Sequence, residues 1–456
     1  MKKFLSILAV ASLLTTSGVY AKGFSNKELL KKIEALEAQL KALKKDTQEQ
    51  LDDINERVDD NEFEASSNRI KWGGGIEMTD SNFKGTTGSI IGMRNGRDYT
   101  NNNKLTTKLK LTMDANVNDK TKFHGRLSMY KNWSDSTAST MIQDPNQGKQ
   151  SNSGTSGLFV ERAYIDYKIN KTFTMTVGRQ PSSDGPGLSL LNNTPRQATY
   201  PALLFDGNAD GIVLTAKTGS NKAFKHTKFR IAYGKGFQKD DNQNGFLANE
   251  NGIKDLNVLG AFYEGKLNIK GMGPNLFVLS YVKATDFVGN AKDTNDTNNK
   301  NLGDINLAGL YFENNHAFGT NLNYFFSLGM SDAKSNGKSY LYNGRPMKLI
   351  DGKGYAYQIG FRYDATKKFK FGYEFNHGSK KWFSFTQGSE DPMNKLATRG
   401  DVHDVYGIYQ MDMNQFVRIG YTDIKYDYTG SGWHIGTPMK TDDKARRLYI
   451  TYNIKF

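Results

Sequence analysis

The chain of 456 residues contains no cysteine. This absence excludes a disulfide framework, a thiolate metal site and a cysteine nucleophile. Proline is scarce, with nine residues, and beyond the amino-terminal segment no run approaches the roughly 18 consecutive apolar residues of a membrane-spanning helix. If this chain crosses a membrane, it does so with strands.

The first 21 residues have the three parts of a secretory signal peptide. Lys2 and Lys3 form a basic start, Phe4 to Leu14 form an apolar stretch, and residues 19–21 form a small-residue cleavage site. The mature chain is therefore expected to be exported. Export disfavours nucleic acid as a partner for the formal net charge of +14 and favours an anion path instead.

Residues 22–66 form a first mature segment whose pattern differs from everything after it. Between residues 27 and 61 there is no glycine, proline or aromatic residue. Apolar residues recur there at alternating spacings of four and three, flanked by Lys and Glu: Leu29, Ile33, Leu36, Leu40 and Leu43. This heptad seam predicts an α-helical coiled coil. A single amphipathic helix lying on the protein's own surface is the alternative.

From residue 67 to residue 456 the apolar residues recur with a period of two, which is the period of a β-strand. The clearest example runs from Leu105 to Val117. About sixteen such segments, of the nine to eleven residues that a membrane barrel needs, follow one another. They are expected near residues 70–79, 104–117, 121–133, 158–169, 172–180, 209–218, 226–236, 256–269, 275–286, 303–314, 319–331, 354–364, 368–379, 402–413, 415–425 and 446–456.

The connections between these segments alternate in length. Short links such as 118–120 and 170–171 are followed by long polar links such as 134–157 and 181–208. Short periplasmic turns and long outer loops are typical of an outer-membrane barrel, whereas a soluble β-sandwich, the alternative, does not explain the alternation. The expected fold class is all-β, a transmembrane antiparallel β-barrel of about sixteen strands preceded by a periplasmic coiled coil.

The chain ends as RRLYITYNIKF, with Leu448, Ile450, Tyr452 and Ile454 at every second position before Phe456. This is a strand with one apolar face, and lipid is expected to cover that face. The pattern is similar to the carboxyl-terminal signature that the barrel assembly machinery of Gram-negative bacteria reads. The expected partners are therefore this machinery through Phe456, the lipid bilayer and lipopolysaccharide.

The alternation also assigns charged residues to the inner face of the barrel. Cations outnumber acids there, and charges inside a barrel imply a water-filled lumen, so the lumen is expected to favour anions. Pairing with acids on adjacent strands is the alternative role for any one of these cations. The expected pore-lining residues are Lys108, Lys110, Arg126, Arg162, Lys168, Arg230, Arg362, Lys370 and Arg418.

The segment from Val160 to Pro181, VERAYIDYKINKTFTMTVGRQP, resembles a porin hairpin in which an Arg-Ala-Tyr strand returns through a strand ending in Gly-Arg-Gln. Its continuation, SSDGPGLSLLNNTPRQATYPALLFDGNADGI, is similar to a family of Gram-negative outer-membrane proteins with an amino-terminal coiled coil and a porin-type barrel. The resemblance implies an outer-membrane location and a homotrimer. It implies no particular solute.

The long link 181–208 holds four of the nine prolines and two apolar patches, residues 188–191 and 202–205. An exposed loop does not need such patches, so this one is expected to fold against something. In general porins the third loop turns inward and narrows the pore, and by that resemblance Asp184, Arg196 and Asp206 are expected at a constriction. A loop packed over the barrel mouth or at a subunit contact is the alternative.

Other chemistry is thinly represented in the sequence. Residues 240–251 begin like a calcium loop, but the twelfth position is Asn251 instead of glutamate, so a solvated outer loop with at most weak Ca²⁺ binding is expected. The histidines lack metal-ligand spacing, and nucleophile and phosphate-loop motifs are absent. No metal, cofactor or catalytic residue is expected, and the protein is not expected to be an enzyme.

The expected function is that of an outer-membrane porin, a passive diffusion channel for small hydrophilic solutes with an anion preference. The alternative is a surface adhesin or envelope tether, in which the outer loops and a peptidoglycan contact through residues 27–61 are the working parts. A gated uptake receptor is disfavoured, because no plug domain of suitable size precedes the barrel.

Overall fold

The computed structural model describes residues 26–67, 70–86, 98–133, 158–180, 185–196, 198–237, 254–272, 275–289, 300–342, 345–386 and 391–456. The chain divides into two compact units, Met1–Arg69 and Ile70–Phe456. The predicted signal peptide, Asp184 and the segment 240–251 lie outside the described residues.

The first unit contains the helix α2 (Asn26–Ser67), 42 residues long. The predicted seam lies along it, and its apolar side chains are well exposed, with 50% for Ile33, 63% for Leu36 and 57% for Leu40. Among the described residues, no helix combines the length and the apolar character needed to cross a membrane. The helix that a coiled coil requires is therefore present, while its pairing with other copies stays a prediction.

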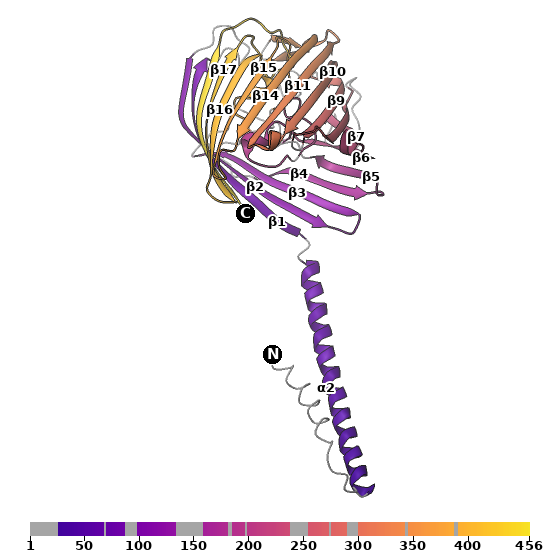
Figure 1. Cartoon of the computed structure of the whole chain (residues 1–456). Coiled ribbons are helices and arrows are strands. Elements are labelled where there is room, and N and C mark those ends of the chain that lie inside the picture. The colour runs from indigo at the N-terminus through magenta and orange to yellow at the C-terminus, as the bar shows by residue number, and fades with distance from the viewer. Residues whose placement is uncertain are drawn as a thin grey trace. The chain divides into compact units, whose positions relative to one another are not determined.

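The second unit is a closed barrel of sixteen antiparallel strands, in which β1 pairs with β18 and each barrel strand pairs with the barrel strands before and after it, β11 with β14 among them (Figure 1). The strand number and the all-β barrel fold predicted from the sequence are confirmed. The strands are β1 (Ile70–Thr86), β2 (Asp98–Asn116), β3 (Thr121–Asn132), β4 (Phe159–Lys168), β5 (Phe173–Gln180), β6 (Ala209–Gly219), β7 (Phe224–Phe237), β8 (Leu256–Leu267), β9 (Asn275–Val288), β10 (Asn301–Asn314), β11 (Leu322–Ser335), β14 (Gly352–Tyr363), β15 (Phe369–Gly378), β16 (Gly400–Gln410), β17 (Gln415–Tyr426) and β18 (Lys444–Lys455).

The structure departs from the predicted pattern at the long-loop end of the barrel. The segment 332–353, predicted as a polar loop, contains a hairpin of β12 (Ser339–Tyr342) and β13 (Arg345–Lys348). Tyr340 is 4% exposed and belongs to an apolar cluster with Phe287 and Leu302, so the hairpin is folded onto the barrel mouth. Burial of this aromatic side chain explains why a segment rich in polar residues is ordered.

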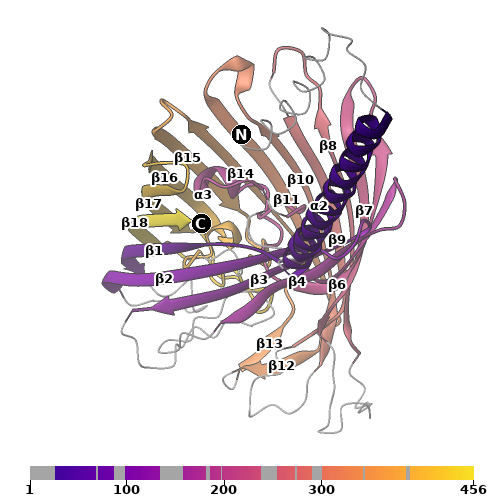
Figure 2. The ribbon, with the colours of Figure 1, turned by 90° about the horizontal axis from the view of Figure 1, so that it is seen from below.

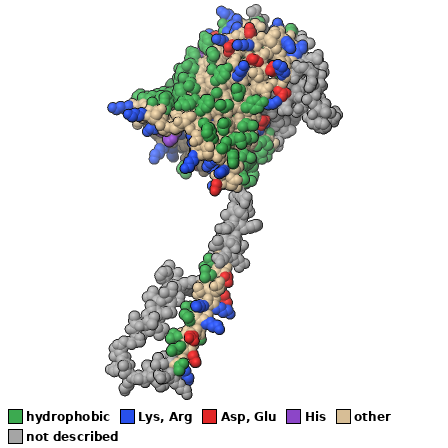
Figure 3. All heavy atoms as spheres, turned by 90° about the vertical axis from the view of Figure 1, so that its right-hand side faces the viewer, with side chains coloured by type: hydrophobic (Ala, Val, Ile, Leu, Met, Phe, Trp, Pro, Cys, Tyr) green, Lys and Arg blue, Asp and Glu red, His purple; other side chains and the backbone are tan. Residues whose placement is uncertain are grey.

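Alternation along β18 separates the two faces of the wall. Leu448 and Ile450 point outward and are 50% and 45% exposed, whereas Tyr449 and Thr451 point inward and are 4% and 1% exposed. Figure 3 shows the result as a broad hydrophobic area on the flank of the barrel, with charged side chains gathered toward its edges. A single chain therefore leaves a wide apolar outer surface uncovered.

The seam between the first and last strands depends on a glycine. Gly74 and Phe456 exchange two backbone hydrogen bonds, of 2.9 and 3.0 Å between nitrogen and oxygen. A Cβ atom at Gly74 would lie 2.8 Å from the ring of Phe456 and 2.5 Å from the carbonyl oxygen of Lys110. Both distances are shorter than a van der Waals contact, so any side chain here would clash. Only glycine lets the terminal aromatic ring lie over the first strand.

Candidate functional site: a lumen narrowed by an inserted loop

The loop between β5 and β6 folds into the barrel and carries the short helix α3 (Ser189–Asn192). Figure 2 shows α3 inside the ring of strands. Leu190 packs on inner side chains of β9, β10 and β11, and Leu191 packs on inner side chains of β16 and β17. The contacted residues are Val278, Tyr311 and Phe325 for Leu190, and Tyr406, Ile408 and Phe416 for Leu191. The apolar patch predicted to fold against something is therefore buried on the inner wall.

Three of the predicted pore-lining cations hold this helix. Nη1 of Arg362 donates to the carbonyl oxygen of Leu190 at 2.9 Å, and Nη1 of Arg418 donates to that of Leu191 at 2.6 Å. Nζ of Lys370 donates to Oδ1 of Asn193 at 2.7 Å. Carbonyls in the last turn of a helix have no partner within the helix and carry negative partial charge, so cations bind them well.

Arg196 attaches the loop to the opposite part of the wall. Its Nη1 lies 2.8 Å from Oε2 of Glu264 on β8, and Glu264 also pairs with Arg230 at 3.0 Å and with Lys228 at 3.8 Å. Glu264 is 5% exposed. The inserted loop is therefore fixed at two places on the wall, and Arg196 lies inside the barrel, as an inward-turning loop requires.

The second half of the loop forms part of a loop layer at the other end of the barrel interior. Leu203 and Leu204 are fully or almost fully buried and pack with Trp382 and Leu396 from the loop between β15 and β16. The backbone N–H of Asp206 donates to the carbonyl oxygen of Phe385 at 2.7 Å, and Asp206 is 0% exposed. Asp206 therefore lies inside this layer and does not line a water-filled constriction as predicted.

A buried lysine fastens the loop between β15 and β16 to the inner wall. Nζ of Lys395, in η4 (Lys395–Ala397), lies 3.0 Å from Oε2 of Glu374 and 2.6 Å from Oδ2 of Asp404. Although burial opposes its charged form, the carboxylates of Asp404 and Glu374 raise the pKa of Lys395 well above its usual value. Lys395 therefore stays charged and acts as an ionic anchor.

Arg399 holds the same loop to its neighbour in the layer. Its guanidinium donates to the carbonyl oxygens of Trp382 at 2.8 Å and Thr429 at 2.8 Å, and also to that of Trp433. The side chain is 1% exposed, so these three bonds replace the water that the charge has lost.

Because the loop is inserted, the solvent exposure of inward-facing side chains differs from strand to strand around the barrel. On β16 the inward-facing Val402, Asp404, Tyr406 and Ile408 are between 1% and 3% exposed. On β2 the inward-facing Lys110 and Thr112 are only partly buried, and Asp114 is exposed. Among the described residues, solvent therefore reaches the inner face of β2 at Lys110, Thr112 and Asp114, and is largely excluded from the inner wall of β14 to β17.

The inner wall of β2 to β4 carries a group of cations, here called the basic wall: Lys108 and Lys110 on β2, Arg126 on β3 and Arg162 on β4. Lys110 is partly exposed, whereas Lys108, Arg126 and Arg162 are 5%, 4% and 9% exposed. Two carboxylates accompany them. Arg126 pairs with Glu161 at 2.9 Å, Arg162 lies 3.8 Å from the same carboxylate, and Glu77 on β1 is directly opposite Lys108 in register. These four cations and two carboxylates by themselves sum to a formal charge of +2, and Asp114 and Asp166 lie beside His124 nearer the short-turn end of the same strands. Lys168 is exposed near the short-turn end of β4 and lies apart from this group.

Glu161 was not predicted to face inward. The β3–β4 pairing shifts by one residue between Arg126 and Leu127, so both Glu161 and Arg162 are buried although they are adjacent in the chain. This β-bulge turns a residue that strict alternation assigns to the outer face. The sequence does carry a signal, because a glutamate on a lipid-facing position of a strand is costly and should indicate a bulge.

The loop layer contains a histidine whose charge is disfavoured. The ring of His434 lies 4.4 Å from that of Phe287 and 5.5 Å from that of Phe385, measured between centroids. Burial and the nearby charge of Arg399 lower the pKa of His434 to about 4. His434 is therefore neutral at pH 7.

Acidification is expected to loosen this layer. Since an unfolded histidine has a pKa of about 6.5 and the folded His434 about 4, the stability it contributes is complete above pH 6.5 and is lost as the pH falls toward 4. Limited proteolysis of residues 426–445 should be faster at pH 5 than at pH 7. A His434→Gln variant should lose most of that difference, and an unchanged difference would exclude His434 as its source.

The protein is therefore a closed sixteen-stranded antiparallel barrel whose interior is narrowed by a loop that is fixed to the wall. Residues 98–453 match the family described as a protein of unknown function, DUF3373, and the chain belongs to that family. No curated protein matches the sequence. A solved structure of an outer membrane protein of Vibrio cholerae, OmpT with loop L8 deleted, is similar at 10% identity with a TM-score of 0.43, over 85% of this chain and 99% of that chain.

Proposed function

We propose that this protein is an outer-membrane porin, a passive channel for small hydrophilic solutes that prefers anions. The observation that carries the proposal is the placement of the loop between β5 and β6. It is fixed to β8 and to β14–β17, while on β2 the inward-facing Lys110 of the basic wall is still partly exposed to solvent. A wet path lined by excess positive charge attracts anions and repels cations.

The outer surface supports a position across a membrane. On β14, Tyr355 and Tyr363 point outward near the two ends and are 60% and 49% exposed, with Ile359 and Phe361 exposed between them. Eight residues separate the tyrosines along the chain, which is about 26 Å along a strand and about 20 Å along the normal of a membrane crossed by tilted strands. An apolar band between aromatic girdles is the outer surface of an outer-membrane barrel, where lipopolysaccharide and lipid would cover it.

Envelope tethering is a second candidate function, favoured by the exposed seam of α2. Ile33, Leu36 and Leu40 leave an apolar stripe uncovered in one chain, and pairing of α2 with the helices of other copies would bury it. We propose a homotrimer whose helices lie in the periplasm and contact peptidoglycan. Peptidoglycan pull-down by the full chain but not by a variant lacking residues 27–61 would support tethering, and equal pull-down would exclude this role for α2.

Conductance in a planar bilayer tests the channel directly. The refolded mature protein should give stepwise openings, and under a tenfold KCl gradient its current should reverse toward the chloride potential. Absence of openings from a folded barrel would contradict the porin proposal.

The basic wall should set the selectivity. Replacing Lys108 and Lys110 with glutamine removes two positive charges and brings the formal charge of the wall to zero, so most of the chloride preference should disappear. The matched control is Lys425→Gln with Lys444→Gln, which removes the same charge from a directly paired, outward-facing position on β17 and β18. If the control shifts the reversal potential as much as the wall variant does, the wall is not the selectivity element.

A further inference from the structure

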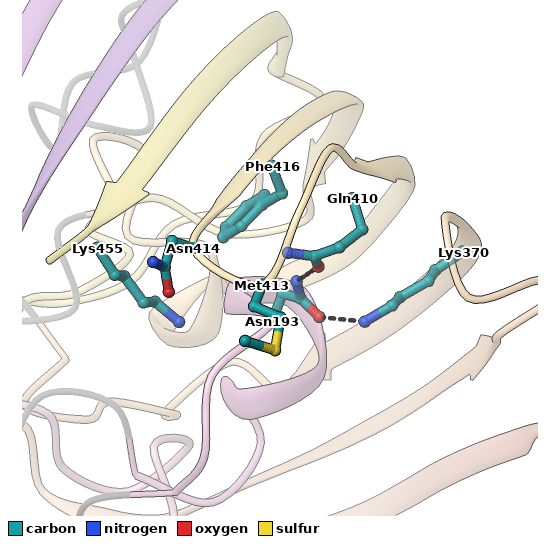
Figure 4. A pocket seen from close by; sticks show the side chains of 7 residues that line it. All are labelled: Asn193, Lys370, Gln410, Met413, Asn414, Phe416 and Lys455. Carbon is teal, nitrogen blue, oxygen red and sulfur yellow. Dashed lines mark hydrogen bonds between the residues drawn. The ribbon is translucent and has the colours of Figure 1, made fainter.

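A pocket of about 300 Å³ lies where the inserted helix meets the short turn between β16 and β17. Figure 4 shows the side chains around it, among them Asn193 from the inserted loop, Lys370 from β15, Asn414 from the turn and Lys455 from β18. At about 30 Å³ for each water molecule, the space holds roughly ten waters or one small solute. It lies at the opposite end of the barrel from the buried loop layer.

The pocket has an excess of positive charge. Lys370 and Lys455 extend into it from opposite sides, and their ammonium groups are near enough to repel each other. Arg362 lies near Lys370 outside the lining, and Asp364 balances its charge by binding that guanidinium through both oxygens at 2.7 and 3.1 Å. The two lysines of the lining therefore give the pocket a formal charge of +2, and an anion in the pocket would relieve the repulsion between them.

Neutral groups around the lysines are held in place. Oδ1 of Asn193 accepts a hydrogen bond from Nζ of Lys370, and Nδ2 of Asn193 donates to Oε1 of Gln410 at 2.6 Å. Met413 and Phe416 are the apolar residues of the lining; Met413 is 94% exposed, and Phe416, on which Leu191 packs, is 2% exposed. An arrangement of fixed polar groups around an apolar surface suits an organic anion better than a simple inorganic one.

We propose that this pocket binds small organic dicarboxylates. One carboxylate would contact Lys370 and the other Lys455, and the hydrocarbon between them would lie against Met413 and the edge of the lining at Phe416. The proposal rests on the porin function only in that the solute reaches the pocket through the lumen. It adds a binding step for one solute class to an otherwise passive path.

Titration calorimetry of the full refolded chain in detergent tests the proposal, with succinate as the probe. We expect saturable binding of succinate. Its affinity should fall about tenfold in Lys370→Gln and about tenfold in Lys455→Gln, since each substitution removes one charge-assisted contact. Lys367→Gln, in the exposed turn before β15, is the matched control and should bind as the parent chain does. Heat-dependent migration of each variant in gels reports whether its barrel has folded.

Three results would overturn the assignment: no succinate binding by the folded parent chain, equal binding by a variant that carries both Lys370→Gln and Lys455→Gln, or equally tight binding of butyrate and inorganic phosphate. The last would show a general anion surface instead of a dicarboxylate site. Because calorimetry requires no ion conduction, binding without conductance would contradict the porin and leave the pocket. Conductance without succinate binding would support the porin function and contradict the dicarboxylate site.

Discussion

Deletion of residues 186–205 should raise the single-channel conductance about twofold or more, because a helix with its side chains is about 10 Å across and fills much of a small lumen. The deletion removes α3 together with Leu190 and Leu191, which cover the inner wall of β9–β11 and of β16–β17. It also frees Arg362 and Arg418 from the carbonyl oxygens that they now bind. Conductance and chloride preference should therefore rise together.

Removal of residues 138–157, a stretch of equal length between β3 and β4, is the control for loop shortening itself. The two deletion variants should be compared in the same bilayer and at the same salt concentration. If deletion of 186–205 leaves a folded barrel with unchanged conductance, the inserted loop does not limit the flow of ions. If conductance rises while chloride preference falls, the two arginines do not contribute to selectivity.

The strands were predictable because their signal is local. Each barrel strand carries its own two-residue period, and successive barrel strands pair with each other, so the sixteen strands of the barrel follow from the order of the segments, whereas the hairpin of β12 and β13 does not. The inward direction of Arg362 and Arg418 follows from the same alternation. Their role as anchors of α3 does not, because it depends on where a loop more than 150 residues away folds.

The missed features are those that depend on distant segments or on a break in the alternation. Glu161 faces inward through a bulge, which shifts the face of a single residue. Lys395 reaches Glu374 and Asp404 only because the loop between β15 and β16 folds into the barrel, and one lysine in a polar segment gives no sign of this. Asp206 was assigned to the constriction from its loop alone, whereas the packing of that loop buries it.

Replacement of Lys395 with methionine should destabilise the barrel by about 3 kcal/mol, the loss typical of removing one partner from a buried ionic group. Glu374 and Asp404 lie directly opposite each other on β15 and β16 and are 2% and 3% exposed. Without the ammonium group, two carboxylates would face each other with little water to separate them. Urea unfolding of the refolded chain in lipid vesicles measures the change, and proteolysis of residues 379–399 reports release of the loop.

A triple substitution distinguishes charge from packing. Lys395→Met combined with Glu374→Gln and Asp404→Asn removes the repulsion while keeping similar volumes, so most of the lost stability should return. Lys367→Met, in an exposed turn, is the control for loss of a lysine and should change stability by less than about 0.5 kcal/mol. If the combined variant is as unstable as Lys395→Met, the lysine acts through its packing and not as an ionic anchor. Recovery of stability with the loop still released would show that the ionic anchor holds the loop, while the barrel wall itself tolerates its removal.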